Sequence, residues 1–456
     1  MNALPDGRLL AFYGDDFTGS SAVMEVLAFA GLQTVLFTDV PTPDELARFH
    51  HCRAIGIAGI ARSQSPAWMD RELPRLFSGL AGLKAPLTHY KVCSTFDSAP
   101  HAGSIGRAID LAAPGLGGAW HPLLVAAPAI HRYQLFGNLF ATVDGQGFRL
   151  DRHPTMSRHP VTPMREADVR LHLAEQTDRR IGLVDYLALV GGRGHAALLE
   201  ARADGAEIVA LDVLDEASLA AAGRLIWENR GDRLFCIGSQ GVEYALIAHW
   251  REAGLLGPPP PRRAAGRARV AAVSGSCSPV TARQIDWAEA NGFAGIRLDA
   301  TAAVVEARWH AALDAAIDEA RTAVAAGMSP LVFTARGPDD PAVTALPEAV
   351  AAAGVEADTV NARIGHGLGA ILKALVTTTE IRRVGIAGGD TSGHALGGLG
   401  VSALEAKVEL APACAISRAM SKDDRIDGLE VALKGGQMGP LDFFGLIERG
   451  RPQDKE

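Results

Sequence analysis

The sequence AGGDTSGH at residues 387–394 combines glycines, an acid and two hydroxyls directly after an apolar run that ends at Ile386. A strand that ends in glycines and leads into a helix leaves several backbone N–H groups unpaired and pointing the same way. Such a turn can cradle a phosphate. Asp390, Thr391 and Ser392 lie within it, and these residue types suit a metal ion or a proton transfer beside a phosphate. On its own, a loop of this kind is a weak indication.

A second polar turn, residues 14–21, follows an apolar run near the N-terminus. Adjacent residues of an extended chain point to opposite sides. We therefore expect only one of Asp15 and Asp16 to face a ligand, while the other caps or braces the start of the next helix. Capping by Asp, Thr and Ser alone would explain this segment equally well.

A third segment, residues 90–98, ends another strand-like run in hydroxyls and an acid. Its polar side chains offer hydrogen-bond donors and acceptors in alternation, as a polyhydroxy carboxylate requires. These side chains are Lys91, Ser94, Thr95, Asp97 and Ser98. Arg62 follows the strand-like run 54–57 and could pair with a substrate carboxylate through its guanidinium fork. A solvated surface arginine is the alternative interpretation.

Two further turns hold small residues after apolar runs. In residues 274–279 the small side chains would let the backbone approach a ligand closely, and Ser278 could cap a helix with Pro279 in its first turn. Residues 434–439 offer a lysine beside flexible glycines. Both turns could equally be structural.

The elements that must position these residues can be read from alternating strand-like and helix-like runs. Strands are expected at 9–13, 34–37, 54–57, 88–92, 123–126, 207–211, 234–237, 270–273, 295–298, 330–333 and 384–386. Helices are expected at 20–30, 67–80, 281–290, 302–325 and 368–375. The alternation predicts an α/β fold of two domains, each with a mostly parallel sheet, and a ligand cleft between them.

Two segments interrupt the alternation. Residues 254–269 contain four successive prolines, which predicts a linker between an N-terminal domain, 1–253, and a C-terminal domain, 270–456. Residues 138–163 contain two His-Pro units and no helical period, and we expect them to form a long ordered loop.

Composition excludes several classes of protein. The 456 residues are too many for one ordinary core. A net charge of −8 argues against a nucleic-acid surface. Five scattered cysteines with no CxxC pair predict reduced thiols rather than a zinc site. The sequence shows no signal-peptide pattern and no apolar run near the roughly 20 residues of a membrane helix, so we expect a soluble cytoplasmic protein.

The remaining reactive side chains have less support. His131, His153 and His159 lack metal-ligand spacing and are expected to make hydrogen bonds, so any metal site stays unknown. Cys93 and Cys277 have no neighbouring base that would mark a nucleophile.

Five of these segments, in this order and over nearly the whole chain, resemble motifs of the four-carbon acid sugar kinase family. Residues 14–19 are similar to the family's ADDxTG motif, and residues 91–98 to its KxxSTxDS motif. Residues 274–284, 388–393 and 434–439 resemble the motifs of its nucleotide-binding domain.

The resemblance implies an N-terminal domain that holds an acid sugar and a C-terminal domain that holds ATP. It places Asp15, Asp16, Arg62, Lys91, Ser94, Thr95 and Asp97 on the substrate side. It places Ser274, Gly275, Ser276, Gly388, Gly389, Asp390, Thr391, Ser392, Lys434, Gly435 and Gly436 on the nucleotide side. Asp390 is interpreted as the base that accepts the substrate hydroxyl proton, or as a ligand of Mg²⁺. Glycine amides, a lysine and Mg²⁺ would stabilise the transferred phosphoryl group.

One segment departs from the family pattern. Where the family has Pro-Ala-Phe-Pro followed by Gly-Arg-Thr, this chain has residues 128–138 and then residues 151–164. This arrangement resembles a subgroup that includes 3-oxo-isoapionate kinases. The expected substrate is therefore a 3-oxo-tetronate, a threonate or erythronate, or a branched relative such as 3-oxo-isoapionate, phosphorylated on a primary hydroxyl.

Two other functions compete with this interpretation. An NAD-dependent dehydrogenase would need a GxGxxG turn after an early strand and an acid at the expected spacing, and neither is present. A non-catalytic sensor of nucleotide or sugar acid would bind ATP without releasing ADP. The expected partner is a small acid sugar, with no nucleic acid and no membrane, and a homodimer is one possible assembly.

Overall fold

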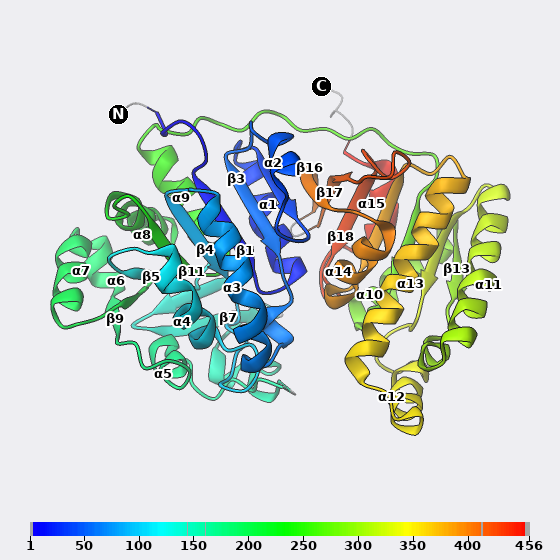
Figure 1. Ribbon diagram of the computed structural model, residues 1–456, viewed down its shortest axis with the longest axis horizontal. Helices are drawn as coiled ribbons and strands as arrows, with labels where there is room; N and C mark the ends of the chain where they lie inside the picture. Colours follow the sequence, from blue (N-terminus) through cyan, green and yellow to red (C-terminus); the bar gives the residue numbers. More distant parts are fainter. Residues whose placement is uncertain (1–2, 144, 160, 412–413, 452–456) are drawn as a thin grey trace. The chain divides into compact units, whose positions relative to one another are not determined.

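The structure is a computed structural model that describes residues 3–143, 145–159, 161–411 and 414–451, except for the side chain of Asp390. The chain divides into two compact units, Met1–Pro259 and Pro260–Glu456, which are drawn in Figure 1 and described separately below. No helix among the described residues is long and apolar enough to cross a membrane.

The N-terminal unit is built on parallel strands in the order β2-β3-β1-β4-β11-β5-β10-β9. Their bounds are β1 (Leu10–Gly14), β2 (Thr34–Phe37), β3 (Ala54–Ala58), β4 (Leu87–Lys91), β5 (His121–Leu124), β9 (Ile181–Val184), β10 (Ile208–Leu211) and β11 (Leu234–Gly238). Strands β1 to β5, β10 and β11 are buried along their whole length, as expected for a sheet with helices on both faces.

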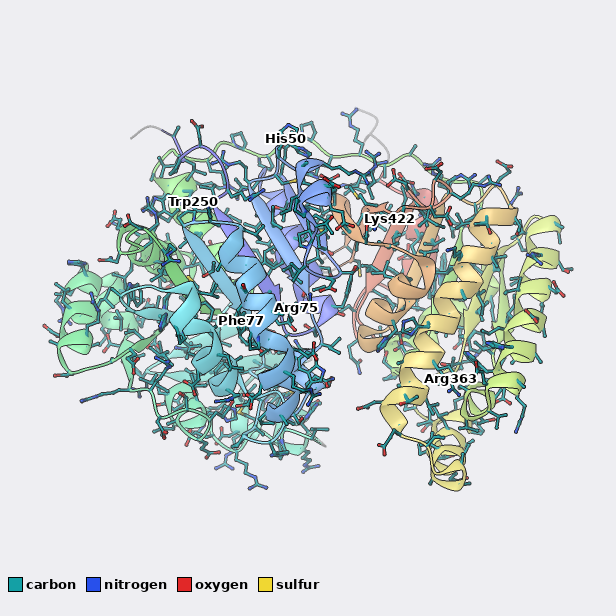
Figure 2. The ribbon with its side chains drawn as sticks, in the orientation of Figure 1. His50, Arg75, Phe77, Trp250, Arg363 and Lys422 are labelled. Carbon is teal, nitrogen blue, oxygen red and sulfur yellow. The ribbon has the colours of Figure 1, made fainter. Side chains whose placement is uncertain are left out.

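Helices cover both faces of this sheet. They are α1 (Phe17–Phe29), α2 (Pro43–Ala47), α3 (Pro66–Gly82), α4 (Ile105–Leu116), α5 (Val169–Ala174), α6 (Tyr186–Val190), α7 (Gly194–Ala203), α8 (Glu216–Glu228) and α9 (Gly241–Glu252). Helix α3 packs on α4, whereas α1 packs on α9, which packs on α8. Phe77 of α3 is labelled in Figure 2, and its ring lies edge-on to Tyr13 and Tyr90 with both centroid distances at 6.1 Å.

A small antiparallel sheet of β6 (Arg132–Leu135), β7 (Asn138–Val143) and β8 (Gln146–Arg149) follows β5. The prediction of one long ordered loop over residues 138–163 is therefore wrong for its first part. Leu139 and Ala141 of β7 are buried while their neighbours are only partly covered, which is the period-2 pattern of a strand. The second part consists of the short 3₁₀ turns Leu150–Arg152 and Met156–Arg158.

In the C-terminal unit the strand order is β13-β14-β12-β15-β18-β17-β16. The strands are β12 (Ala271–Ser274), β13 (Phe293–Arg297), β14 (Ser329–Phe333), β15 (Arg383–Ala387), β16 (Ala403–Ala411), β17 (Cys414–Met420) and β18 (Glu430–Lys434). Strand β17 is antiparallel to β16 and β18, and the other pairs are parallel. Two α/β units with mostly parallel sheets are therefore confirmed.

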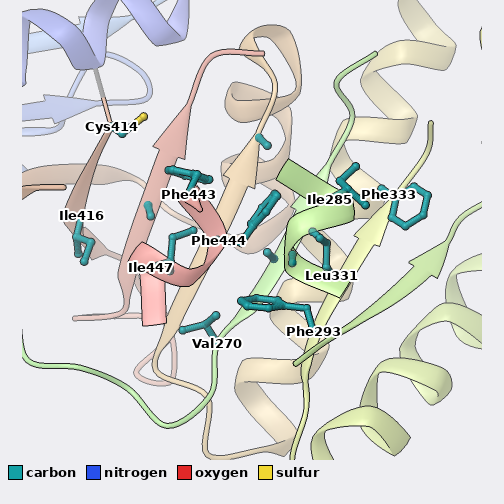
Figure 3. Packing of buried hydrophobic residues seen from close by; sticks show 14 of the residues in the cluster. Val270, Ile285, Phe293, Leu331, Phe333, Cys414, Ile416, Phe443, Phe444 and Ile447 are labelled. Atoms are coloured by element: carbon teal, nitrogen blue, oxygen red, sulfur yellow. The ribbon is translucent and has the colours of Figure 1, made fainter. Parts of the chain in front are cut away.

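The helices of this unit are α10 (Pro279–Ala290), α11 (Glu306–Ala325), α12 (Ala342–Ala353), α13 (Ala357–Thr378), α14 (Gly389–Leu399) and α15 (Phe443–Arg449). Phe443, Phe444 and Ile447 of α15 join a buried apolar cluster with residues of α10 and the sheet (Figure 3). The helix predicted at 302–325 begins only at Glu306, because Val305 is extended (φ −127°, ψ 116°) after a 3₁₀ turn, Ala300–Val304.

Each sheet has a point where the chain leaves neighbouring strands in opposite directions. From β1 the chain goes to β2 on one side, and from the adjacent β4 it goes to β5 on the other. From β12 it goes to β13, and from the adjacent β15 to β16 on the opposite side. Ligands of open α/β sheets bind at the carboxyl ends of the strands at such switch points. Ligand sites are therefore expected at the loops that follow β1, β4, β12 and β15.

Candidate active site

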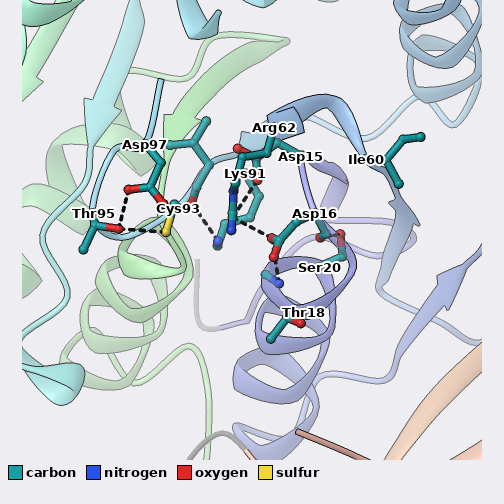
Figure 4. A network of polar contacts seen from close by, with 12 residues as sticks. Asp15, Asp16, Thr18, Ser20, Ile60, Arg62, Lys91, Cys93, Thr95 and Asp97 are labelled. Atoms are coloured by element: carbon teal, nitrogen blue, oxygen red, sulfur yellow. Dashed lines mark hydrogen bonds and ion pairs between the residues drawn. The ribbon is translucent and has the colours of Figure 1, made fainter. Parts of the chain in front are cut away.

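At the switch point of the N-terminal unit, Arg62 bridges two neighbouring carboxylates (Figure 4). Arg62 lies in the helical turn Ala61–Ser63 after β3, and its amide donates to the carbonyl of Asp15 at 2.9 Å. Its Nη2 donates to Asp15 Oδ1 at 3.0 Å and to Asp16 Oδ1 at 2.7 Å. The alternative of a solvated surface arginine is therefore wrong, since only 27% of the side chain is exposed.

The two acids have different environments. Asp16 caps α1, since its Oδ1 accepts from the amide of Gly19 at 2.9 Å, and this confirms that one acid of the pair caps the helix. Asp15 is 1% exposed and its carboxylate faces Arg62. Burial raises the pKa of Asp15 to about 6, with Arg62 opposing the rise and Asp16 adding to it. A carboxyl with this pKa can exchange a proton near neutral pH.

Lys91 ends β4 beside this pair of acids. Its ammonium group is buried and donates to the carbonyl of Val92 at 2.7 Å. A Cβ at Gly19 would lie 2.3 Å from Asp16 Oδ1 and 2.7 Å from Lys91 Nζ. Only glycine therefore fits where the first turn of α1 passes between the acid and the lysine.

The loop after β4 carries the predicted hydroxyls. Thr95 Oγ1 donates to Asp97 Oδ1 at 2.7 Å and lies 3.0 Å from Cys93 Sγ. Burial raises the pKa of Cys93, which keeps it a thiol and agrees with the absence of a predicted nucleophile there. Ser94 is half-buried in the same loop. Phe96 adopts a left-handed backbone conformation (φ 56°), an uncommon state that is found at functional loops.

In the C-terminal unit, the strand register aligns three of the predicted turns. Ser274, Ala387 and Lys434 are register partners at the carboxyl ends of β12, β15 and β18. The amide of Gly275 donates to Ala387 O at 3.1 Å, and the amide of Gly388 donates to Lys434 O at 3.0 Å. The three glycine-containing turns therefore start side by side.

The glycines in these turns are required by close packing. A Cβ at Gly275 would lie 2.3 Å from Thr391 Oγ1, and one at Gly436 would lie 2.7 Å from Ser276 Oγ. Gly388 has φ 131°, which disfavours any other residue, and a Cβ there would lie 2.9 Å from Thr391 Oγ1. We call the three turns that start at Ser274, Ala387 and Lys434 the glycine cradle. It is lined by backbone and by the hydroxyls of Thr391 and Ser276.

Two helices begin at this edge of the sheet. Ser278 caps α10 by accepting from the amide of Thr281 at 3.0 Å, and Pro279 is its first residue, as predicted. Helix α14 begins at Gly389, and Ser392 Oγ donates to the carbonyl of Gly388 at 2.6 Å. The amides in the first turn of a helix lack intrahelical partners and attract anions. The side chain of Asp390 lies outside the described part of the structure.

Lys434 holds the third turn in place. Its buried Nζ lies 2.8 Å from Thr281 Oγ1, 3.2 Å from Gly435 O and 3.3 Å from Gly436 O. These contacts can use all three donors of the ammonium group. Burial lowers the pKa of Lys434 to about 8. Lys434 therefore holds residues 434–436 against the start of helix α10. It also places a positive charge beside these residues.

Two polar residues at these sites were not predicted. Thr281 links Lys434, Ser276 and Gly436, with Oγ1 at 3.1 Å from Ser276 Oγ and 2.9 Å from Gly436 O. The sequence signal that could have identified Thr281 is its position three residues after Ser278, which caps α10. Arg132 lies near Cys93 and Asp97, which oppose the lowering of its pKa by burial. No motif in the sequence marked Arg132.

The predictions for histidines and cysteines agree with the structure. His153 Nδ1 accepts from the amides of Thr155 and Met156, and His159 Nδ1 from that of Thr162. Such contacts are structural hydrogen bonds. The cysteines are free thiols, as predicted, at positions 52, 93, 236, 277 and 414.

Comparison with known proteins gives matches over both units. Residues 10–246 match the family described as a sugar-binding N-terminal domain, and residues 271–444 match the nucleotide-binding C-terminal domain. The chain is 50% identical to the 3-oxo-isoapionate kinase of Paraburkholderia graminis, with 98% of this chain and 96% of that protein covered. It is 31% identical to the 3-oxo-tetronate kinase of Methylobacterium radiotolerans, with 96% and 97% covered.

Two crystal structures share the fold. A Salmonella typhimurium protein aligns with a TM-score of 0.78 at 22% identity, covering 96% of this chain and 98% of that one. A Haemophilus influenzae protein aligns with a TM-score of 0.72 at 23% identity and the same coverage.

Proposed function

Because this chain belongs to the four-carbon acid sugar kinase family, we propose that it transfers the γ-phosphoryl group of ATP to a primary hydroxyl of 3-oxo-isoapionate. That the chain is a sugar-acid kinase follows from the kinases that it matches over nearly its whole length. The observation that carries the choice of substrate is the 50% identity to a 3-oxo-isoapionate kinase, against 31% to a 3-oxo-tetronate kinase.

The triphosphate of ATP is proposed to bind at the glycine cradle of the C-terminal unit. The proposed contacts are Ser274, Gly275, Ser276, Gly388, Gly389, Asp390, Thr391, Ser392, Lys434, Gly435 and Gly436. Support comes from the glycines at positions 275, 388 and 436, which let the three turns pack closely against Thr391 and Ser276, and from the helix N-termini beside these turns. Lys434 would act by shaping the cradle and by its charge.

Mg²⁺ fits the chemistry of this cradle, because hydroxyl and carboxylate oxygens are the protein ligands that Mg²⁺ prefers. Thr391 and Ser276 supply hydroxyls against the glycines, and Asp390 stands in the same turn. Mg²⁺ would neutralise charge on the phosphate oxygens during transfer.

The acid sugar is proposed to bind at the switch point of the N-terminal unit. The proposed contacts are Asp15, Asp16, Arg62, Lys91, Ser94, Thr95 and Asp97. Acceptors and donors alternate there, as a polyhydroxy ligand requires.

Asp390 is the proposed base that accepts the proton of the substrate hydroxyl. Binding of Mg²⁺ is the alternative role for its carboxylate. Asp15 is a second candidate for the base, because it is buried and its pKa is raised towards neutrality.

The test is ADP release, measured with a coupled assay over 3-oxo-isoapionate, 3-oxo-tetronate, threonate and erythronate. We expect the highest kcat/KM with 3-oxo-isoapionate. ATP binding without ADP release from any of these acids would instead support a sensor. We place the reaction in the cytoplasm, where ATP is supplied, and light scattering would test for a homodimer.

A further inference from the structure

Arg132 stands at the same edge of the sheet as the proposed acid-sugar site. Its carbonyl accepts from the amide of Ala127 at 2.9 Å, and its amide donates to the carbonyl of Ala127 at 3.2 Å. Ala127 lies just beyond β5, and the register aligns Leu124 of β5 with Gly238 of β11 and with Lys91 of β4. Neighbouring strands are about 4.8 Å apart, so β5 and β4 are about 10 Å apart, within reach of an arginine side chain.

The guanidinium group of Arg132 keeps a buried donor free. Its Nη1 donates to the carbonyls of Ile130 and His131, both at 3.2 Å. Its Nε is buried and has no hydrogen-bond partner among the described residues. A buried N–H without a partner costs free energy, which a ligand oxygen would recover.

Arg132 is a half-buried cation with the acid Asp97 near it. Burial lowers the pKa of Arg132, and the nearby Cys93 and Asp97 oppose this change. Burial lowers the pKa of His153, and the charge of Arg132 lowers it further. The segment that departs from the family pattern therefore brings a cation near the loop that carries Asp97.

Arg62 is a poorer anchor for a carboxylate. Its Nε, like that of Arg132, is buried without a hydrogen-bond partner among the described residues, but its Nη2 already binds Asp15 and Asp16, at 3.0 Å and 2.7 Å. A third carboxylate there would be repelled by both acids, whereas a hydroxyl could donate to them. Cys93 and Asp97 affect both Arg62 and Arg132 electrostatically, so their loop is near both guanidinium groups.

We propose that Arg132 binds the carboxylate of the acid sugar, while Arg62 with its two acids receives the hydroxyl end. This inference rests on the proposed function. It gives the ligand a direction across the loop at residues 93–97. A 3-oxo acid suits Arg132 because its carboxylate and keto carbons are separated by one carbon, so an oxygen of each group can meet an N–H group of one guanidinium.

The test compares Arg132→Gln and Arg132→Lys with the wild type. The matched control is Arg149→Gln in β8, because Arg149 is exposed and pairs with Asp151. We expect Arg132→Gln to raise KM for 3-oxo-isoapionate by about 10- to 100-fold, as for loss of a hydrogen bond to a charged group. KM for ATP should stay unchanged, Arg132→Lys should recover part of the loss, and the control should match the wild type.

A second measurement separates binding from a structural role. The wild type should favour the acid over its carboxamide, and Arg132→Gln should lose this preference while Arg62→Gln keeps it. An unchanged KM for the acid sugar in Arg132→Gln, or a preference for the acid over its carboxamide that survives in Arg132→Gln, would overturn the assignment. If the wild type phosphorylates no acid of the panel, the proposed function fails as well. If Arg132→Gln does not fold, Arg132→Met, which also removes the charge, is tested for the same preference.

Discussion

Replacing Arg62 by glutamine should move the acid limb of the pH profile of kcat/KM for the acid sugar to higher pH. Asp15 must be ionised to accept the strong, charge-assisted hydrogen bond from the substrate hydroxyl that a neutral carboxyl group cannot offer. Burial raises the pKa of Asp15 to about 6, and Arg62 is the largest influence that opposes the rise. The wild-type limb is therefore expected near pH 6.

The size of the change follows from the ion pair. Arg62 Nη2 lies 3.0 Å from Asp15 Oδ1. Two unit charges about 4 Å apart interact by about 4 kcal/mol at an effective dielectric constant of about 20, or roughly a thousandfold in proton affinity. Arg62 divides its charge between Asp15 and Asp16, so we expect at least a tenfold effect, which moves the limb to about pH 7 or above.

The assay is kcat/KM for the acid sugar at saturating ATP, from about pH 5 to about pH 9, for Arg62→Gln and the control Arg149→Gln. Arg62→Gln should also raise KM for the acid sugar and leave KM for ATP alone. An acid limb that stays at its wild-type position in Arg62→Gln would refute the reasoning, and so would a defect confined to ATP.

Three other outcomes are expected. Asp390→Asn should abolish turnover and largely preserve ATP binding by calorimetry; near-normal turnover would remove Asp390 from the catalytic role. Gly275→Ala should raise KM for ATP about tenfold or more, because its Cβ would lie 2.3 Å from Thr391 Oγ1, whereas Gly257→Ala, with nothing within 4 Å of its Cβ, should not. Asp15→Asn should abolish the pH dependence of the free energy of unfolding that the buried Asp15 carboxyl causes in the wild type. The pKa of Asp15 is about 6 in the folded chain and about 3.9 when unfolded, so the folded state binds the proton more tightly. The free energy of unfolding of the wild type should therefore fall as the pH rises from about 4 to about 6, by up to about 3 kcal/mol. The measurement is the free energy of unfolding in urea, for the wild type and Asp15→Asn, at several pH values between about 4 and 6. A wild-type free energy that changes with pH no more than that of Asp15→Asn would contradict the prediction.

Most of the fold could be predicted because each strand-like run carries its own apolar pattern. Each of the expected strands overlaps an observed one. Strand β16 was missed because partly exposed residues alternate with buried ones in Ala403–Ala411. Such alternation is typical of antiparallel strands with one covered face.

The turns of the site could be predicted because glycine, acids and hydroxyls follow apolar runs. What could not be predicted are contacts between turns far apart in the chain. Arg62 meets Asp15 and Asp16 only because β3 and β1 are neighbours in the sheet. Lys434 meets Thr281 across 153 positions of sequence. Strand order decides these contacts, and local residue patterns do not record it.

The central claim is that the phosphoryl group of ATP reaches the acid sugar. Phosphorus NMR of the wild type with ATP, Mg²⁺ and 3-oxo-isoapionate tests it most directly. The account predicts a new phosphomonoester signal that grows in step with ADP. ADP accompanied only by inorganic phosphate, or no loss of ATP, would contradict it.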